Sequence, residues 1–263
     1  DLATDSAIRG AHASRNYLSD APYGDLDPVP WLDRYAYLPD LGVGRLVETP
    51  AHIVGALEAF VAEGGELDPE SAAIAGYDFL TDGARQTKAN LTGVDDTDPN
   101  EALINDEWTR QNLLDGAYGS DPPDVISPNA HFDHYRALPA IGNLNPDEAE
   151  LFEVGDLGQV GAPSTDLTNR IVFTMGCHGG LNVPNRGVAN ETDWAEVYGA
   201  ARAIYVGNTG YGYGDTATVA LTERVMANFA FYLDGDRTVG QALAQAKQDQ
   251  FGRAGLYGVY DLK

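Results

Sequence analysis

Short, continuous runs of apolar residues alternate along this chain with segments that have helical periodicity. The apolar runs occupy residues 41–46, 71–80, 170–176 and 201–208, and a shorter run ends near His131. Strands that are apolar on both faces are typical of a parallel sheet whose two sides are covered by helices. The pattern therefore predicts an α/β fold, a three-layer α/β/α sandwich with a mostly parallel central sheet.

The clearest helix signal follows the first apolar run. Thr49 has the side chain of an N-cap, Pro50 suits the first helical position and Gly64 suits the end. Apolar residues between Ile53 and Val61 recur at helical spacing. Further helices are predicted over residues 99–115 (capped by Asp98), 191–200, 217–233 and 239–250 (capped by Thr238). Such helices between strands are the crossovers that a parallel sheet needs.

We expect one domain preceded by an irregular segment. Residues 1–40 are rich in Asp, Pro and Tyr, and we expect them to pack on a single domain formed by residues 41–263. The sequence has no run of about 18 apolar residues, so we expect no transmembrane segment. The chain begins at Asp1 without an initiator Met, which predicts a piece of a longer precursor.

The chain is strongly acidic. It has 263 residues, with 40 Asp and Glu but only 16 Lys and Arg, so its net charge is −24 at pH 7. Nucleic-acid binding needs clustered Lys and Arg, which argues against nucleic acid as a partner. A negative field attracts cationic ligands, so basic peptides or proteins are the expected substrates. The acidic surface fits a salty environment or an ordinary soluble protein equally well.

The only cysteine, Cys177, comes at the end of an apolar run. A lone cysteine is often a small buried residue, but with a suitable histidine it is a candidate nucleophile. His131 follows the preceding predicted strand, and the carboxyl ends of neighbouring parallel strands lie side by side. We therefore predict that Cys177 is the nucleophile and that His131 is its general acid and base.

The Gly-rich turn around Cys177 adds further expectations. It directs backbone N–H groups toward the position of an oxyanion, and we expect the N–H groups of Cys177 and Phe132 to stabilise it. His134 is the alternative base, and His178 is predicted to line the substrate cleft or to have a structural role. Zinc is a further alternative. The imidazoles of His131, His134 and His178 and the thiol of Cys177 are suitable zinc ligands.

An acidic residue is predicted to select the substrate. Asp82 follows the apolar run at 71–80, so we expect it near the same edge of the sheet as Cys177. A carboxylate there could pair with the basic side chain of a substrate, with Asp78 as a weaker candidate. The competing interpretation is a simple turn residue beside Gly83.

Two loops complete the candidate site. Residues 208–215, rich in Gly and Tyr, follow the last predicted strand, and loops at this edge of a sheet often carry function. We expect Asn208, Tyr211 and Tyr213 to contact substrate. In the N-terminal segment, Asp20, Asp25 and Asp27 are closely spaced oxygen ligands of the kind that calcium prefers, although solvated Asp clusters are also common in loops.

Several stretches resemble the gingipain family of caspase-like cysteine peptidases. They are "PYGDLDP" and "LPDLGVGRLVETPAHI" near the N-terminus, "RIVFTMGCHGG" at the nucleophile, and "AIYVGNTGYGYGDT" with the two helices that follow. The similarity extends over most of the chain from about Tyr23 onward. It departs from the family at two positions, because Phe132 replaces the usual glycine and Gly176 replaces the usual alanine or serine.

The resemblance implies a caspase-like fold and a cysteine endopeptidase that needs no organic cofactor. It implies a specificity pocket walled by residues 208–215, cleavage after Arg or Lys, and structural calcium. An extracellular or cell-surface precursor is expected with it. The alternative is a peptidase-like domain that has lost activity and serves as a binding or surface module, which the departure at Phe132 favours.

Overall fold

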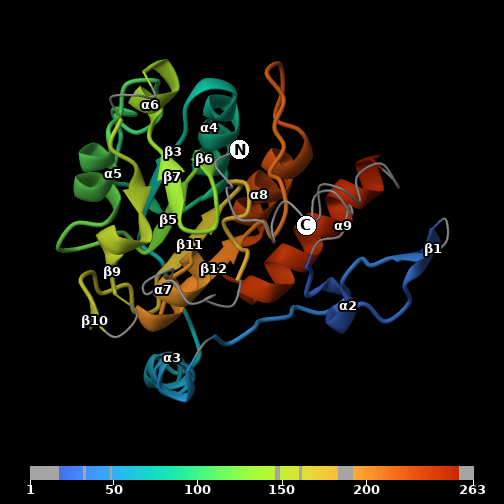
Figure 1. The fold of residues 1–263 in the computed structure, drawn as a ribbon. Helices are drawn as coiled ribbons and strands as arrows, with labels where there is room; N and C mark the ends of the chain where they lie inside the picture. Colours follow the sequence, from blue (N-terminus) through green and yellow to red (C-terminus); the bar gives the residue numbers. More distant parts are fainter. Residues whose placement is uncertain are drawn as a thin grey trace.

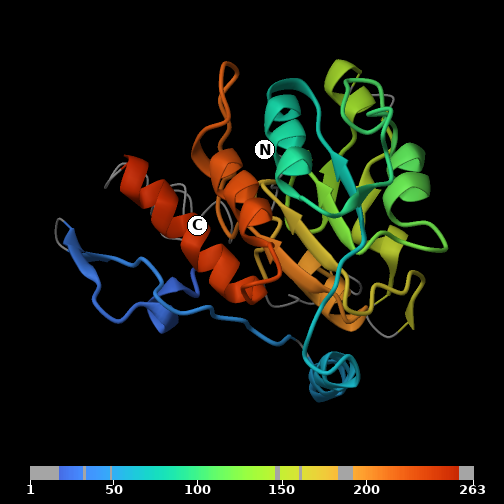
Figure 2. The ribbon, with the colours of Figure 1, turned by 180° about the vertical axis from the view of Figure 1, so that it is seen from behind.

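A five-stranded, all-parallel sheet forms the centre of the molecule, with the strand order β12-β11-β5-β3-β4. The computed structural model describes residues 18–31, 34–47, 49–145, 149–159, 162–182 and 192–254. The sheet strands are β3 (Ser71–Ala75), β4 (Asp95–Asp96), β5 (Val125–Pro128), β11 (Ile171–Thr174) and β12 (Ile204–Gly207). Helices cover both faces of this sheet (Figures 1 and 2). The predicted three-layer α/β class is confirmed.

Alternate residues of each central strand enter two separate hydrophobic cores. In β3, Ile74 packs in one core and Ala75 in the other. The Ile74 core contains α4 (Thr81–Asn90), α8 (Leu221–Tyr232) and α9 (Val239–Ala254). The other core contains α5 (Arg110–Ala117), α7 (Trp194–Ala200) and the antiparallel strands β6 (His131–Phe132), β7 (Arg136–Leu138) and β8 (Phe152–Glu153). Both strand faces are therefore apolar because both are buried.

The strands and helices around the nucleophile are close to their predicted positions. β11, β12, α7 and α9 form where the apolar runs and caps indicate. Thr238 is confirmed as a cap, because its hydroxyl accepts a hydrogen bond from the Gln241 N–H at 3.2 Å. The helix predicted over 217–233 begins later, at Leu221.

Three predicted elements are wrong. Residues 41–46 form no strand. The predicted strand 71–80 ends at Ala75 and continues as a 3₁₀ helix, η1 (Asp78–Leu80), and then α4, which the sequence interpretation missed. The chain turns sharply at Gly76, where a Cβ atom would lie 2.7 Å from the Ala84 Cβ. Of the helix predicted over 99–115, the C-terminal part forms, as α5. Near the predicted start, the Asp98 carboxylate instead accepts hydrogen bonds from the N–H groups of Ala102 and Leu103, which forms a turn.

α3 (Pro50–Ala62) has the predicted cap but not the expected burial. The Thr49 hydroxyl accepts a hydrogen bond from the His52 N–H at 3.3 Å, and the chain leaves the helix at Glu63 and Gly64. Yet Leu57 and Val61 are 47% and 71% exposed. Figure 1 shows α3 at the end of the molecule, where its described packing partner is α7. Helical periodicity predicted the helix correctly, but it did not predict a buried face.

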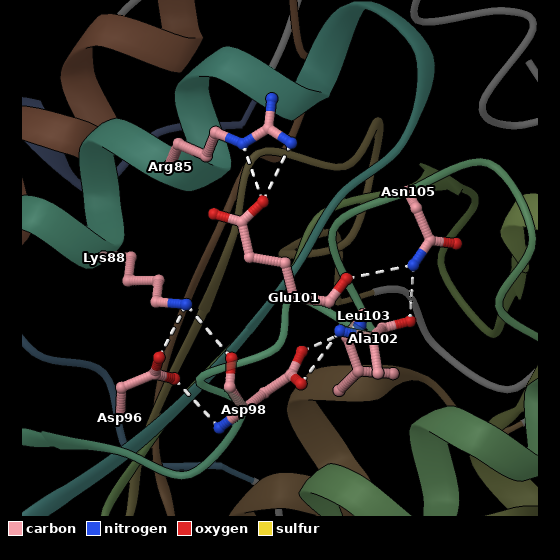
Figure 3. A network of polar contacts seen from close by, with 8 residues as sticks. All are labelled: Arg85, Lys88, Asp96, Asp98, Glu101, Ala102, Leu103 and Asn105. Atoms are coloured by element: carbon pink, nitrogen blue, oxygen red, sulfur yellow. Dashed lines mark hydrogen bonds and ion pairs between the residues drawn. The ribbon is translucent and has the colours of Figure 1, made fainter.

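Polar contacts join α4 to the chain segment that contains β4 (Figure 3). Arg85 pairs with Glu101 at 2.8 Å, and Lys88 pairs with Asp96 and donates to the Asp98 carbonyl at 3.0 Å. Arg85 is 53% exposed, so its pair with Glu101 contributes little to the stability of the fold. Several such contacts together orient α4, whose first turn faces the candidate site.

The remaining elements are short and lie around the sandwich. They are α2 (Ala21–Gly24), β1 (Val29–Trp31), β2 (Arg34–Ala36), α6 (Ala140–Leu144), η2 (Val154–Leu157), β9 (Gly158–Gln159) and β10 (Ala162–Pro163). α2 and β1 lie on the outer side of α9 (Figure 1), where Gln248 donates a hydrogen bond to the Pro39 carbonyl at 3.0 Å. In the part of the chain that the structure describes, none of the helices has the length and apolar character needed to span a membrane.

Candidate active site

The pairing of β5 with β11 puts His131 and Cys177 at equivalent positions. Ile171 pairs with Val125 in parallel, and beyond the strands the Met175 N–H donates to the Asn129 side chain at 3.2 Å, across 46 residues. His131 and Cys177 are separated by the same number of positions. Each lies three residues beyond the end of its strand. The register therefore brings both residues to the same edge of the sheet, and their action as a catalytic pair stays a prediction.

Cys177 is only partly exposed and its thiol faces the loop that precedes α8. Its Sγ donates to the Gly212 carbonyl over 3.7 Å. That loop is pressed on the end of β11, since a Cβ at Gly212 would lie 1.7 Å from the Met175 carbonyl oxygen. Burial raises the pKa of the Cys177 thiol above its ordinary value. At neutral pH the resting group is therefore a thiol rather than a thiolate.

The His131 ring lies between two aromatic rings. The Tyr77 and Phe79 ring centroids are each 5.9 Å from it. Burial lowers the pKa of His131, and the nearby Asp78 carboxylate opposes that shift. The imidazole is therefore neutral at pH 7 and able to accept a proton.

Tyr77 fixes the backbone of His131. Its hydroxyl accepts a hydrogen bond from the His131 N–H at 3.2 Å and donates one to the Leu138 carbonyl at 2.9 Å. The hydroxyl thus bridges β6 and β7 at the residue pair that contains His131. Tyr77 is fully buried. Sequence reasoning missed this role, although Tyr77 follows β3 as closely as the other site residues follow their strands.

Asp78 also lies beside His131 rather than in a separate pocket. Its backbone has φ of 53°, a conformation that a residue other than glycine rarely adopts. The Asp78 N–H donates to the Asp106 carboxylate at 2.7 Å, which helps to hold this conformation. Unusual backbone at a strand end is frequent in functional sites.

Gly176 and Phe132, the two positions at which the sequence departs from the gingipain pattern, pack against each other. A Cβ atom at Gly176 would lie 2.4 Å from Cδ2 and 2.7 Å from Cβ of Phe132. The Phe132 ring is 1% exposed and lies 5.5 Å from the Trp194 ring. The phenyl group therefore occupies the space that a side chain at 176 would need. Gly176 is the smaller residue that makes Phe132 possible.

Three predicted site residues are buried inside the protein. His134 is 4% exposed, and its ring lies 4.8 Å from that of Tyr135. His178 is 1% exposed, with φ of 58° and its N–H on the Gly210 carbonyl at 2.7 Å. Asn208 is also 1% exposed and donates to the Met175 carbonyl at 2.7 Å. His178 and Asn208 are therefore buried in this structure, and their contact with substrate stays a prediction.

Tyr211 and Tyr213 are the more accessible residues of the predicted pocket loop. Their ring centroids are 6.2 Å apart, and Tyr213 is 39% exposed. The Tyr211 ring also lies 4.9 Å from that of His178. The loop between β12 and α8 projects beyond the sheet beside α4 (Figures 1 and 2). Its tyrosines can thus form a wall next to the Gly212 carbonyl and the thiol.

Asp82 lies in the first turn of α4, not at a strand end as predicted, and it is hydrogen-bonded to Glu223 of α8. Glu223 is 1% exposed, accepts from the Gly83 N–H at 3.1 Å, and its own N–H donates to the Tyr213 carbonyl at 3.2 Å. Burial, with the neighbouring Asp82 charge, raises the pKa of Glu223 to about 7. The Glu223 carboxyl therefore keeps its proton until the pH approaches neutral, and it joins Asp82 to the tyrosine loop.

Asp25 and Asp27 come together with Asp40, whereas Asp20 lies outside this cluster. The three have ligand atoms within 4.8 Å of one another, and they are the metal-compatible group found among the described residues. Their carboxylates already accept backbone N–H groups, such as Leu26 on Asp40 at 2.8 Å. Calcium binding here stays a prediction. The zinc alternative is unsupported, since the histidines and cysteine form no such group within the described ranges.

Comparison with known proteins gives no match to a family model, to a curated protein or to a solved structure. The proposed function therefore rests on the geometry of the site.

The contact between residues 176 and 132 can be tested by a double-mutant cycle. Gly176→Ala should lower the free energy of unfolding by about 1–3 kcal/mol because the new methyl group overlaps Phe132. In the Phe132→Leu background the same change should cost at least about 1 kcal/mol less. Gly155→Ala is the control, as a Cβ there meets nothing within 4 Å. Equal costs for the two alanines in urea unfolding would contradict the proposed overlap.

The Asp82–Glu223 pair predicts a pH-dependent stability. The folded-state pKa of Glu223 is raised, so its contribution is fully present below the ordinary carboxyl pKa and is lost as pH rises through about 7. Glu223→Gln should remove about 2 kcal/mol of the fall in unfolding free energy between pH 5 and pH 8. Glu58→Gln, at an exposed position of α3, is the matched control. Parallel pH profiles for wild type and Glu223→Gln would refute the raised pKa of Glu223.

Proposed function

We propose that this protein is a cysteine endopeptidase in which Cys177 is the nucleophile and His131 is the general acid and base. The observation that carries the proposal is the shared register, which puts a thiol and an imidazole three residues beyond two adjacent parallel strands. Strand ends of this kind are where α/β proteins assemble sites. The aromatic enclosure of His131 and the loop pressed against Cys177 support the same conclusion.

The pKa directions favour a dyad that is neutral at rest. His131 accepts the thiol proton as the sulfur attacks the substrate carbonyl, and then donates it to the leaving amine. Water afterwards hydrolyses the thioester, with His131 as the base. This order needs no preformed thiolate, which agrees with the raised pKa of Cys177 and the lowered pKa of His131.

Backbone N–H groups of Cys177 and Phe132 are proposed to stabilise the oxyanion. The Asp133 N–H donates to the Arg136 carbonyl, so this pair is hydrogen-bonded across β6 and β7. Hydrogen-bonded and non-hydrogen-bonded pairs alternate in an antiparallel ladder. The Phe132–Ala137 pair is therefore of the second kind, and the Phe132 N–H is directed away from β7. A phenylalanine in place of glycine still supplies that donor.

Basic substrates are proposed because acidic groups adjoin the loop that faces the thiol. Asp82 and Glu223 lie at the base of this loop, and a guanidinium can pair with both oxygens of a carboxylate. Entry of a cation would favour ionisation of Glu223. An extracellular or cell-surface location remains part of the same proposal.

A second candidate function is a peptidase-like binding module without activity. The observation that favours it is the resting state of Cys177, whose thiol is hydrogen-bonded to Gly212 and has a raised pKa. An inert buried cysteine has the same properties. Activity measurements on site variants separate the two candidates.

Substitution of the dyad should abolish peptide hydrolysis. Cys177→Ala should remove all enzymatic turnover, and His131→Ala should lower kcat/KM at least about 100-fold, since proton transfer contributes a factor of this order. His134→Ala is the matched control, and it should retain activity in the fraction that folds. A fluorogenic peptide library provides the measurement. Activity in Cys177→Ala would exclude the mechanism, and loss confined to His134→Ala would identify the other histidine as the base.

Specificity can be tested separately from chemistry. Asp82→Asn should lower kcat/KM for substrates with Arg at the cleaved position by about 10- to 100-fold, because it weakens a charged pair. The rate of Cys177 alkylation by iodoacetamide should stay unchanged. Asp95→Asn, at an exposed position of β4, is the control. Preference for Ala or Leu would defeat the claim, while unchanged Arg preference in Asp82→Asn would move the acid to Asp78 or Asp215.

A further inference from the structure

A cavity of about 230 Å³ lies beside β12, on the side of this strand away from β11. Neither Cys177 nor His131 lines it. One wall is formed by β12, a second by α8 and α9, and the third by residues 19–21 and 39–47 of the N-terminal segment. Its size is below the roughly 300–1,000 Å³ of pockets that hold drug-sized ligands. It is therefore suited to a small molecule.

The N-terminal wall is held on α9 by close backbone contact. A Cβ atom at Gly42 would lie 2.5 Å from the Gly240 carbonyl carbon, so the two chains meet without side chains between them. The hydroxyl of Thr209 also donates to the Leu18 carbonyl. Leu41 and Leu46 are 52% and 49% exposed, which leaves this wall in contact with solvent. A ligand can enter from that side.

Lys247 is the cation on the α9 wall. It lines the cavity together with Gly240, Leu243 and Ala244, which are seven, four and three residues earlier and so share one helix face. Within the described parts of the chain, its ammonium group has neither a hydrogen bond nor an ion pair, and it interacts at longer range with Asp20. An ammonium group in such a position lacks the partner that normally offsets its burial.

A second basic residue, Arg45, lines the same cavity. Like Lys247, it forms no ion pair among the residues that the structure describes. Most other described cations are paired, for example Lys88 with Asp96 and Arg170 with Asp124. Arg45, Lys247 and Asp20 together give the cavity lining a net charge of +1, whereas the whole chain has a net charge of −24. The cavity is thus a local positive site on an acidic protein.

The rest of the lining is mainly aliphatic. Val206 comes from β12, Val225 and Met226 from α8, and Leu243 from α9. An inorganic anion would leave these apolar walls in contact with water, whereas a hydrocarbon chain would cover them.

We propose that this cavity binds a small organic monocarboxylate, with its carboxylate on Lys247 and its apolar body against β12, α8 and α9. Asn208 and Thr209, at the start of the tyrosine loop, also line this cavity, but the proposal does not depend on peptidase activity. Burial lowers the pKa of Lys247 to about 8, and a bound carboxylate offsets that effect by pairing with the ammonium form.

Hexanoate is the probe, with hexanamide and hexylammonium as neutral and cationic controls of the same length. Millimolar hexanoate should raise the Tm of the wild-type protein by about 2–4 °C, and the controls should not. Lys247→Met removes the charge and keeps an apolar side chain of similar length. It should weaken hexanoate binding at least about tenfold in calorimetry. Lys88→Met, outside the cavity, is the matched control and should leave the affinity unchanged.

A labelling experiment locates the site. The chain has three lysines, Lys88, Lys247 and Lys263, so reductive methylation followed by mass spectrometry reports each one. Hexanoate should slow methylation of Lys247 and leave Lys88 unaffected. Three results would overturn the proposal: equal binding of hexanamide, full affinity in a folded Lys247→Met variant, or equal protection by sulfate, which would mean an unspecific anion effect.

Discussion

The parallel pairing between β5 and β11 is the constraint on which the candidate site depends. It sets the two strands in one register, so that whatever follows them lies at matching heights on one edge of the sheet. β3 pairs with the other side of β5 and adds Tyr77 and Asp78 at the same edge. His131, Cys177 and the residues that support them therefore follow three adjacent strands. Their relative positions are determined by backbone hydrogen bonds before any side chain contributes.

Close backbone approach then holds the loops on these strand ends. Positions 176, 180 and 212 have no room for a Cβ atom, and a side chain at Gly180 would lie 2.2 Å from the Gly207 carbonyl oxygen. Such packing orders the loops without long side chains, whose ordering is entropically costly. Phe132 and Gly176 belong to the same arrangement. A large residue at one position is matched by the loss of a side chain at the other, so these departures from the family pattern do not by themselves argue for lost activity.

Much of the architecture could be predicted from the sequence because strand burial and helix caps are local signals. β11 and its turn could be recognised from a run of apolar residues followed by glycines. The rule that the carboxyl ends of neighbouring parallel strands lie side by side then predicted His131 at the same edge of the sheet. Tertiary contacts decided the rest. The end of β3 at Gly76 depends on contact with Ala84 in α4, and the burial of Asn208 depends on the Met175 carbonyl. Glu223 contacts Asp82 and accepts a hydrogen bond from Gly83, which is 140 positions earlier in the chain, and a contact over such a separation leaves no periodic signal in the sequence.

Desolvation, more than the net charge of −24, sets the ionisation of the groups around the sheet edge. Burial raises the pKa of Cys177 and Glu223 and lowers that of His131 and Lys247, and in each case it favours the neutral form. Glu223 is therefore an acidic group whose charge can change when a ligand binds, and a cationic ligand would favour its ionised form. Low polarity also widens the difference in proton affinity between the thiolate and the imidazole. The two pKa shifts therefore disfavour the thiolate–imidazolium pair until a substrate carbonyl accepts the developing charge.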